Sequence, residues 1–244
     1  MTDITYIYGK HSVTEALTNA RKAVSEVFLA KQFDDQEFIS FLKKNGVTVT
    51  EKFPSGVDAG AVHQGVSARV SLQLLVRNYS EFIEKLSITP ETALVLLGEV
   101  QDPQNVGAVI RSAAAFGISG VLIPEHNQAQ ITAAVVKVSA GMAFRVPLVS
   151  IGNINTTLRD LKDRGFAIYG LAGDAKYTMT KEEFTLPTVF VLGNESEGIR
   201  EKTKELCDKL LSIPMHPQCE SLNAATSASV AFYAWSAKHP KALR

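Results

Sequence analysis

The chain has 244 residues, of which 45% are hydrophobic and 20% charged, a balance typical of a globular protein with a sizeable core. No apolar stretch approaches the roughly 18 residues that span a bilayer, and the first ten residues lack the pattern of a secretory signal. Lysine plus arginine equals aspartate plus glutamate at 25 each, so the formal net charge is zero. This argues against a protein that binds nucleic acid mainly by neutralising phosphates, but it does not exclude one basic face.

The first segment, residues 1–76, is predicted to form a small α/β unit. The expected elements are helices at 12–19 and 36–44 and strands at 26–30, 47–50 and 66–70. Gly46 ends the second helix, and residues 54–56 are predicted to form a turn. Residues 77–92 are more polar and contain Thr89 and Pro90, so we expect a linker here, with a short helix at 81–86.

From residue 93 onward, apolar strands alternate with helices. The expected strands are 93–100, 120–123, 146–149, 167–171, 188–192 and 210–213, and a last helix is expected at 222–237. This alternation predicts an α/β domain over 93–244, with a mostly parallel sheet covered by helices on both faces.

The first polar motif follows the strand that starts this domain. Asp102 is a suitable N-cap, Pro103 fits the first helical position, and Gly117 would end the helix. Arg111 is the only charge on this helix, and a structural ion pair explains it as well as a phosphate contact does. Asn105 lies six residues earlier, roughly 240° around the helix, so cooperation between the two side chains would need a second subunit.

The second motif runs from Gly193 to Gly198, directly after the strand expected at 188–192. A strand that ends in a glycine turn before a helix is common at nucleotide sites, because glycine lets the backbone approach a ligand. Glu195 is expected to bind a hydroxyl or a cation, or to cap the helix. The chain contains no dinucleotide-binding GxGxxG, phosphate-binding loop or GxSxG signature, which disfavours a dinucleotide-dependent dehydrogenase.

The third motif leads into the last helix, at residues 212–223. Ser221 is predicted to cap that helix, whose apolar surface must pack under the sheet or against another subunit. His216 and Cys219 match no zinc spacing, so no metal is predicted. The two cysteines, Cys207 and Cys219, form neither a CxxC pair nor a disulfide framework, which favours a reducing, cytoplasmic setting.

Together, the motifs resemble those of the SpoU (TrmH) family of RNA 2′-O-methyltransferases, in the SPOUT superfamily. The matching letters are DPQNVGAVIRSAAAFG, VFVLGNESEGI, and SIPM followed by SLN, in the family's order. The segments YGKHSVTEAL and GAVHQGVSARV resemble the RNA-binding domain of the RlmB-like subgroup, so the likeness covers nearly the whole chain. The sequence departs mildly at Ser196, where glycine is common, without losing a functional group.

The resemblance implies an S-adenosyl-L-methionine-dependent enzyme, a C-terminal trefoil knot and a homodimer. Motif positions assign catalysis or its support to Arg111, Asn105, Glu195, Ser221 and Asn223, and the cofactor pocket to Gly193, Gly198, Ile213 and Leu222. The implied target is a guanosine of bacterial 23S ribosomal RNA. The possible RNA contacts in the first unit, each of which would otherwise be a solvated charge, are Lys10, His11, Arg21, Lys22 and His63.

Three alternatives stay open on the sequence. Related enzymes of the same layout methylate transfer RNA, or ribosomal sites that confer resistance to thiopeptide antibiotics. A non-catalytic RNA-binding paralogue would keep the fold without the reaction, although the retained Arg111, Glu195 and Asn223 argue against it.

Overall fold

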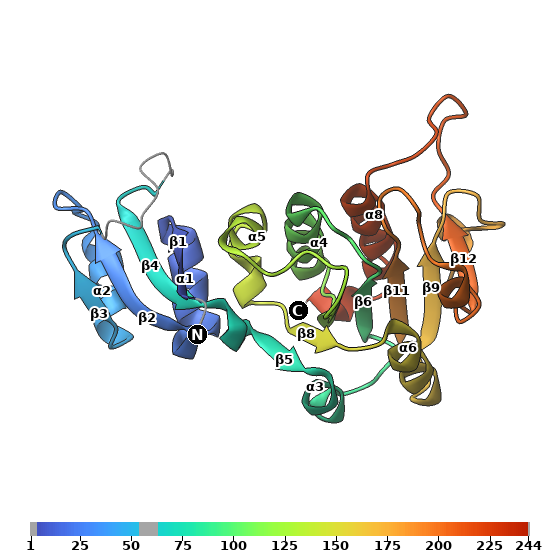
Figure 1. Cartoon of the computed structure of the whole chain (residues 1–244), viewed down its shortest axis with the longest axis horizontal. Helices are drawn as coiled ribbons and strands as arrows, with labels where there is room; N and C mark the ends of the chain where they lie inside the picture. Colours follow the sequence, from blue (N-terminus) through green and yellow to red (C-terminus); the bar gives the residue numbers. More distant parts are fainter. Residues whose placement is uncertain (1–3, 54–62, 244) are drawn as a thin grey trace.

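The computed structural model describes residues 4–53 and 63–243, and it contains two sheets side by side (Figure 1). The turn expected at 54–56 lies outside the described residues. The smaller sheet has the strand order β1-β4-β2-β3. Its elements are β1 (Ile4–Tyr8), α1 (Lys10–Asn19), η1 (Arg21–Ala23), β2 (Val24–Leu29), α2 (Gln36–Lys44), β3 (Thr48–Thr50) and β4 (Val66–Ser71).

The predicted helix at 36–44 is confirmed to the residue, and the other predicted elements of this unit are confirmed with shifts of one or two residues at their ends. Strand β1 was not predicted, because its residues are mostly exposed or half-buried and show no clean apolar alternation. It becomes a strand because its backbone pairs antiparallel with β4, from Ile4 opposite Ser71 to Tyr8 opposite Ser67.

The larger sheet has the order β10-β12-β9-β11-β6-β7-β8-β5, and all its strand pairs are parallel. Its strands are β5 (Val76–Asn78), β6 (Ala93–Leu97), β7 (Gly120–Pro124), β8 (Leu148–Ile151), β9 (Ala167–Leu171), β10 (Tyr177–Thr178), β11 (Thr188–Leu192) and β12 (Lys209–Ser212). The helices are α3 (Tyr79–Lys85), α4 (Pro103–Ala115), α5 (Ala133–Val138), α6 (Ile154–Asp163), α7 (Glu201–Lys204) and α8 (Ala224–Ser236), and the shorter turns are η2 (Leu72–Leu75), η3 (Met142–Phe144), η4 (Met179–Lys181) and η5 (Pro240–Leu243). The predicted parallel α/β architecture is thus confirmed.

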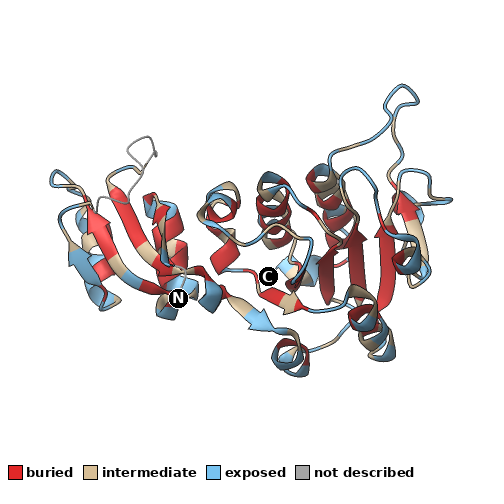
Figure 2. Cartoon of the chain, in the orientation of Figure 1, coloured by how far each residue is buried: buried red, intermediate tan, exposed pale blue. Residues whose placement is uncertain are grey.

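Helices cover both faces of this sheet. Alternate residues of β6 point to opposite sides, so Val95 joins the core under α4 and α8 while Leu94 joins the core under α3 and α6. Every residue of β6 and β11 is buried, as the red strands in Figure 2 show. Two-sided burial explains why these strands are continuous apolar runs in the sequence.

The segment expected as a linker carries regular structure in the large sheet. β5 pairs in parallel with β8, and Phe82 and Ile83 of α3 pack in the core beneath the sheet. Among the described residues, no helix is long and apolar enough to cross a membrane.

The strand order brings the motifs together. β12, β9, β11 and β6 are consecutive neighbours in the sheet and run parallel, so the loops at their carboxyl ends emerge at one edge. In open parallel sheets, ligands bind at this edge. The three motifs therefore meet although about 90 residues separate the first from the second.

Candidate functional site

A cavity of about 560 Å³ opens among the loops that follow β9, β11 and β12. The four residues expected to bind a cofactor all line it, namely Gly193, Gly198, Ile213 and Leu222. Three residues expected to support catalysis line it as well, namely Glu195, Ser221 and Asn223. The structure thus gathers the second and third motifs around one hollow.

The wall formed by the second motif is a tight backbone turn. The N–H of Asn194 donates to the carbonyl oxygen of Gly198 at 2.9 Å, and the reverse bond is 3.0 Å long. A Cβ placed on Gly193 would lie 2.2 Å from the carbonyl carbon of Gly198, so only glycine fits there. The side-chain oxygen of Asn194 accepts the N–H groups of Ser196 and Glu197, which fixes the shape of the turn.

A chain of amide and carboxylate side chains joins the three motifs. Glu195 Oε1 accepts a hydrogen bond of 3.0 Å from Asn105 Nδ2. Asn105 Oδ1 in turn accepts one of 2.8 Å from Asn223 Nδ2. We call these residues the Glu195–Asn105–Asn223 chain. Because Asn105 is only 6% exposed, its amide orientation is fixed by these two bonds.

The carboxylate of Glu195 is held in its charged form. Burial by itself raises the pKa of Glu195, but hydrogen bonds from Asn105 and from the backbone, including the N–H groups of Asp102 and Gln101, lower it more. The net pKa lies below the ordinary value of 4.5. Glu195 is therefore an anionic acceptor at neutral pH and a weak proton acceptor, which suits positioning better than proton withdrawal.

The cap of the last helix differs from the prediction. Asn223, not Ser221, caps α8, and its Oδ1 accepts the N–H groups of Ala225 at 2.8 Å and Thr226 at 3.3 Å. Ser221 is exposed two residues before the cap, where its carbonyl accepts a bond from Cys219. The helix begins at Ala224, so Ser221 lies too early in the chain to reach the free N–H groups. Asp102 caps α4 as predicted.

Arg111 lies apart from the other predicted site residues. It is exposed on α4, whereas Asn105 on the same helix is buried, as their spacing predicts. The Arg111 side chain forms no hydrogen bond or ion pair with any residue that the structure describes, so the alternative of a structural ion pair finds no support within the described chain. Its guanidinium is available for a phosphate or for a second copy of the chain.

A second hollow, of about 590 Å³, lies between α4, α5 and α8. Asn105 and Asn223 line it, so the Glu195–Asn105–Asn223 chain stands between the two hollows. Its rim carries Tyr233, whose side chain packs edge-on against Phe116 while the residue stays 62% exposed. A large aromatic residue left in solvent beside a hollow is typical of an interaction surface.

Sequence reasoning missed part of the first cavity. Leu171 at the end of β9, with Gly173 and Asp174 of the loop after it, contributes a wall. The available signal was a glycine and an acidic residue directly after an apolar strand. Asp174 adds a carboxylate that suits ligand hydroxyls or positive charge. Among the described residues, no three histidine, cysteine or acidic side chains are grouped as a metal site.

Sequence reasoning also missed the contact that joins the first two motif loops. Glu99 has a left-handed backbone, with a φ of 66°, and its side chain forms an ion pair of 2.8 Å with Arg200. Its carbonyl accepts a 3.0 Å bond from Asn194 Nδ2. The strained residue is therefore held at both its backbone and its side chain.

In the smaller unit, two of the proposed RNA contacts have partners within the protein. Arg21 donates to the carbonyl oxygens of Asn45 at 2.9 Å and Gly46 at 2.8 Å, so its guanidinium ties η1 to the end of α2. Lys10 forms an ion pair with Asp35. Arg21 is best explained as a structural residue.

Comparison with protein families matches residues 92–233 to the SpoU rRNA Methylase family. Residues 6–73 match a family described as RNA 2′-O ribose methyltransferase substrate binding. The chain is 37% identical to the 23S rRNA (guanosine-2′-O-)-methyltransferase RlmB of Yersinia pestis, covering 93% of this chain and 94% of the relative. It is 34% identical to the enzyme of the same name from Escherichia coli K12, covering 93% and 96%.

Solved structures share the fold. The SpoU methyltransferase AviRb from Streptomyces viridochromogenes, solved in complex with the cofactor AdoMet, has a TM-score of 0.83 at 21% identity and covers 98% of this chain and 91% of that one. A TrmH/SpoU tRNA modifying enzyme from A. aeolicus has a TM-score of 0.55 at 24% identity, covering 70% and 83%.

Proposed function

The chain belongs to the SpoU rRNA methylase family, and on that basis we propose that it methylates the 2′-hydroxyl of a guanosine in 23S ribosomal RNA. Its cofactor is S-adenosyl-L-methionine. The proposed target rests on the sequence identity of 34–37% between this chain and 23S rRNA guanosine methyltransferases, over 93% of its length. Such a substrate would place the protein in the cytoplasm.

The cavity at the carboxyl edge of the sheet fits this cofactor. Its walls combine apolar side chains from Leu192, Ile213 and Leu222 with the backbone of Gly193. That mixture suits a flat, largely apolar base with polar edges. A cavity of about 560 Å³ is within the range of cofactor sites. We propose that Gly193, Gly198, Ile213 and Leu222 hold the methyl donor through backbone groups and apolar contact.

The bound cofactor supplies a methyl group on a sulfonium, which is transferred as the ribose oxygen forms a bond to carbon and the carbon–sulfur bond breaks. The protein's main task is to align that oxygen and to hold a proton acceptor beside it. The Glu195–Asn105–Asn223 chain lies at the boundary between the two hollows, where the two substrates would meet. We propose that this chain orients the ribose, with Ser221 at the mouth of the cavity.

We assign Arg111 to the ribose hydroxyl and the neighbouring phosphate. A guanidinium in a protein keeps its proton, so almost no neutral form is present to act as a base. A phosphate oxygen of the substrate is the better proton acceptor, with Arg111 holding it in place by two parallel hydrogen bonds. The absence of a partner for Arg111 among the described residues supports this role.

Arg111 and Asn105 face different directions, so we propose that the enzyme acts as a homodimer in which Arg111 reaches the site of the partner copy. The surface we assign to the dimer is the exposed side of α4 and α8 around Tyr233. A Tyr233→Asp variant is expected to become monomeric in analytical ultracentrifugation and to lose methyl transfer. A monomeric wild type, or an active monomeric variant, would contradict the dimer.

We divide the chain into a substrate RNA-binding domain at 1–76, a linker at 77–92 and a catalytic domain at 93–244. The separate small sheet and the separate family matches at 6–73 and 92–233 support this division. The threading that would make the C-terminal trefoil knot stays a prediction from the family.

The test of the function is transfer of label from radiolabelled S-adenosyl-L-methionine to unmodified bacterial ribosomal RNA. We expect label in the large-subunit RNA with the wild type, none with Arg111→Ala, and a large loss with Arg111→Lys, which cannot form the paired hydrogen bonds. Near-full turnover by Arg111→Lys would rule out the bidentate role. Label in transfer RNA alone would favour the alternative target, and cofactor binding without transfer to any RNA would favour a non-catalytic paralogue.

A further inference from the structure

A buried carboxylate lies where the small unit meets the catalytic unit. Glu15, on α1, has a side chain only 8% exposed. It accepts hydrogen bonds from Arg145 Nε at 3.1 Å and Nη2 at 2.9 Å, and a third from Asn19 at 2.9 Å. Arg145 follows η3 of the catalytic unit, so this two-pronged ion pair joins the two units. A carboxylate this deeply buried is tolerated only while its partner is in place.

The backbones also approach each other closely at this junction. Gly141, directly before η3, has a φ of 80°, and a Cβ on it would lie 3.1 Å from Cα of Ser12 in α1. A side chain here would push α1 away from η3. The glycine therefore serves the contact between the units in addition to the left-handed turn.

The apolar core continues through the same junction. One cluster of buried residues includes Val13 and Ala16 of α1, Val136 of α5 and Phe144 of η3. α5 packs against β1 on one side and α4 on the other, and Figure 1 shows it between the two sheets. Domain interfaces are expected to move unless they are extensive and apolar. This interface is apolar, and at its edge lies an ion pair between the buried carboxylate of Glu15 and the exposed guanidinium of Arg145.

We propose that Glu15 and Arg145 hold the small unit against the catalytic unit, so that the two units form one rigid body. The protein then holds its RNA at a fixed distance from the cofactor cavity. The proposal rests on the proposed RNA substrate. Glu15 and Arg145 are positioning residues: they touch neither the cavity nor the Glu195–Asn105–Asn223 chain. The linker does not act as a hinge.

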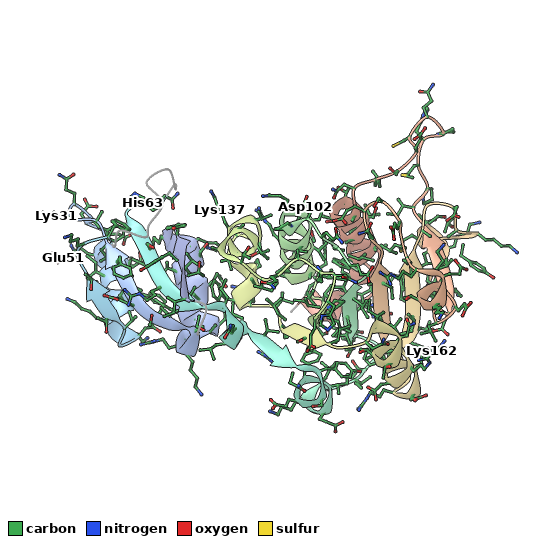
Figure 3. The ribbon with its side chains drawn as sticks, in the orientation of Figure 1. Lys31, Glu51, His63, Asp102, Lys137 and Lys162 are labelled. Carbon is green, nitrogen blue, oxygen red and sulfur yellow. The ribbon has the colours of Figure 1, made fainter. Side chains whose placement is uncertain are left out.

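The fixed spacing has a direct consequence for the substrate. Figure 3 shows Lys31 and His63 of the small unit, Lys137 of α5 and Asp102 at the start of α4 along one edge of the molecule. RNA that contacts Lys31 or Lys137 by its phosphates would be held at a set distance from the cavity. Contacts remote from the reacting group then help to place the ribose, because both ends of the RNA engage one rigid surface.

The experiment compares the wild type with Arg145→Gln, with the double variant Glu15→Gln/Arg145→Gln, and with Arg164→Gln as a control. Arg164 is a matched control because its guanidinium also pairs with carboxylates, those of Asp160 and Glu84. It lies on the opposite side of the large sheet from the junction between the units. Small-angle X-ray scattering at equal protein concentration reports the docking without any RNA. The enzymatic readouts are KM for a large-subunit RNA fragment, kcat at saturating RNA, and the Kd for S-adenosyl-L-methionine.

Arg145→Gln leaves a buried charge without its partner, so we expect a larger maximum dimension and a KM for RNA raised on the order of tenfold. kcat and the cofactor Kd should stay near wild type. The double variant removes the buried charge and allows two amides to pair, so both readouts should return toward wild type. Arg164→Gln should change neither.

Unchanged scattering and KM in Arg145→Gln would overturn the proposal, as would equal losses in kcat and cofactor binding, which indicate general unfolding. The test separates this inference from the proposed function. If the wild type methylates no RNA, the proposed function fails, while scattering still decides whether Glu15 and Arg145 hold the units together.

Discussion

At the residue scale, Asn223 has two roles that different atoms of its side chain perform. Its Oδ1 caps α8, and its Nδ2 donates to Asn105. The same side chain therefore fixes the start of a buried helix and one end of the polar chain at the site. This double use links stability to activity at one position, and the two effects are separable by substitution.

We expect Asn223→Ala to lose about 1 kcal/mol of unfolding free energy, because the cap is removed, and to lose activity as well. Asn223→Asp keeps the capping oxygen but cannot donate to Asn105, so it should be more stable than Asn223→Ala while activity still falls. Urea denaturation and the methylation assay measure the two effects. Full activity in Asn223→Asp would show that Asn223 serves only as a cap.

The lowered pKa of Glu195 predicts a pH dependence. A carboxyl whose pKa is lower in the folded protein stabilises it above the unfolded pKa, and that contribution is lost as the pH falls through the folded pKa. The stability difference between the wild type and Glu195→Gln should therefore be constant at neutral pH and shrink only below the ordinary value of 4.5. Denaturation across a pH series measures it. A difference that already fades near neutrality would contradict the charged, hydrogen-bonded state of Glu195.

At the element scale, the loops after β6 and β11 are held together by contacts at Glu99. Its backbone carbonyl binds Asn194, its carboxylate binds Arg200, and its left-handed backbone carries strain. The shape of the second motif's turn thus depends on a residue outside all three motifs. Strain of this kind persists where surrounding contacts hold it.

Substitution of Glu99 tests this account. Glu99→Gly relieves the left-handed strain while losing the ion pair, so we expect stability close to the wild type. Glu99→Ala loses the same pair and keeps the strain, so it should be about 1 kcal/mol less stable than the glycine variant. Both should bind S-adenosyl-L-methionine more weakly, as calorimetry would show, because the two loops lose the ion pair with Arg200 and keep only the backbone bond to Asn194 and the bonds to Glu195. Equal stability of the two variants would argue against backbone strain at this position.

At the scale of the whole molecule, one buried cluster extends from the small sheet to the catalytic sheet. We therefore expect a single cooperative unfolding transition in calorimetry, with equal calorimetric and van't Hoff enthalpies. A separate, lower transition for the small unit would contradict the continuous core. Arg145→Gln should split or broaden the transition, because it weakens the contact that joins the two units.

The larger sheet and most of its elements were predictable because the sequence features that specify them are local. The buried strands β9 and β11 are apolar runs bounded by polar residues, and Asp102 followed by Pro103 is a local signal for the start of α4. The prediction of Ser221 as the cap failed because several polar residues precede α8 and only the path of the backbone selects Asn223. β1 and β5 were missed because pairing with distant strands, not composition, makes them strands.

The sequence by itself determined the parallel α/β architecture, the motifs and, through them, the family, because periodicity and motif spacing are properties of neighbouring residues. Only the tertiary structure decided that Glu195, Asn105 and Asn223 form one hydrogen-bonded chain and that Glu15 meets Arg145, whereas the spacing on α4 already separated Arg111 from Asn105. Those contacts join residues some 90 to 130 positions apart. Their distances depend on strand order and packing, which local chain chemistry does not encode.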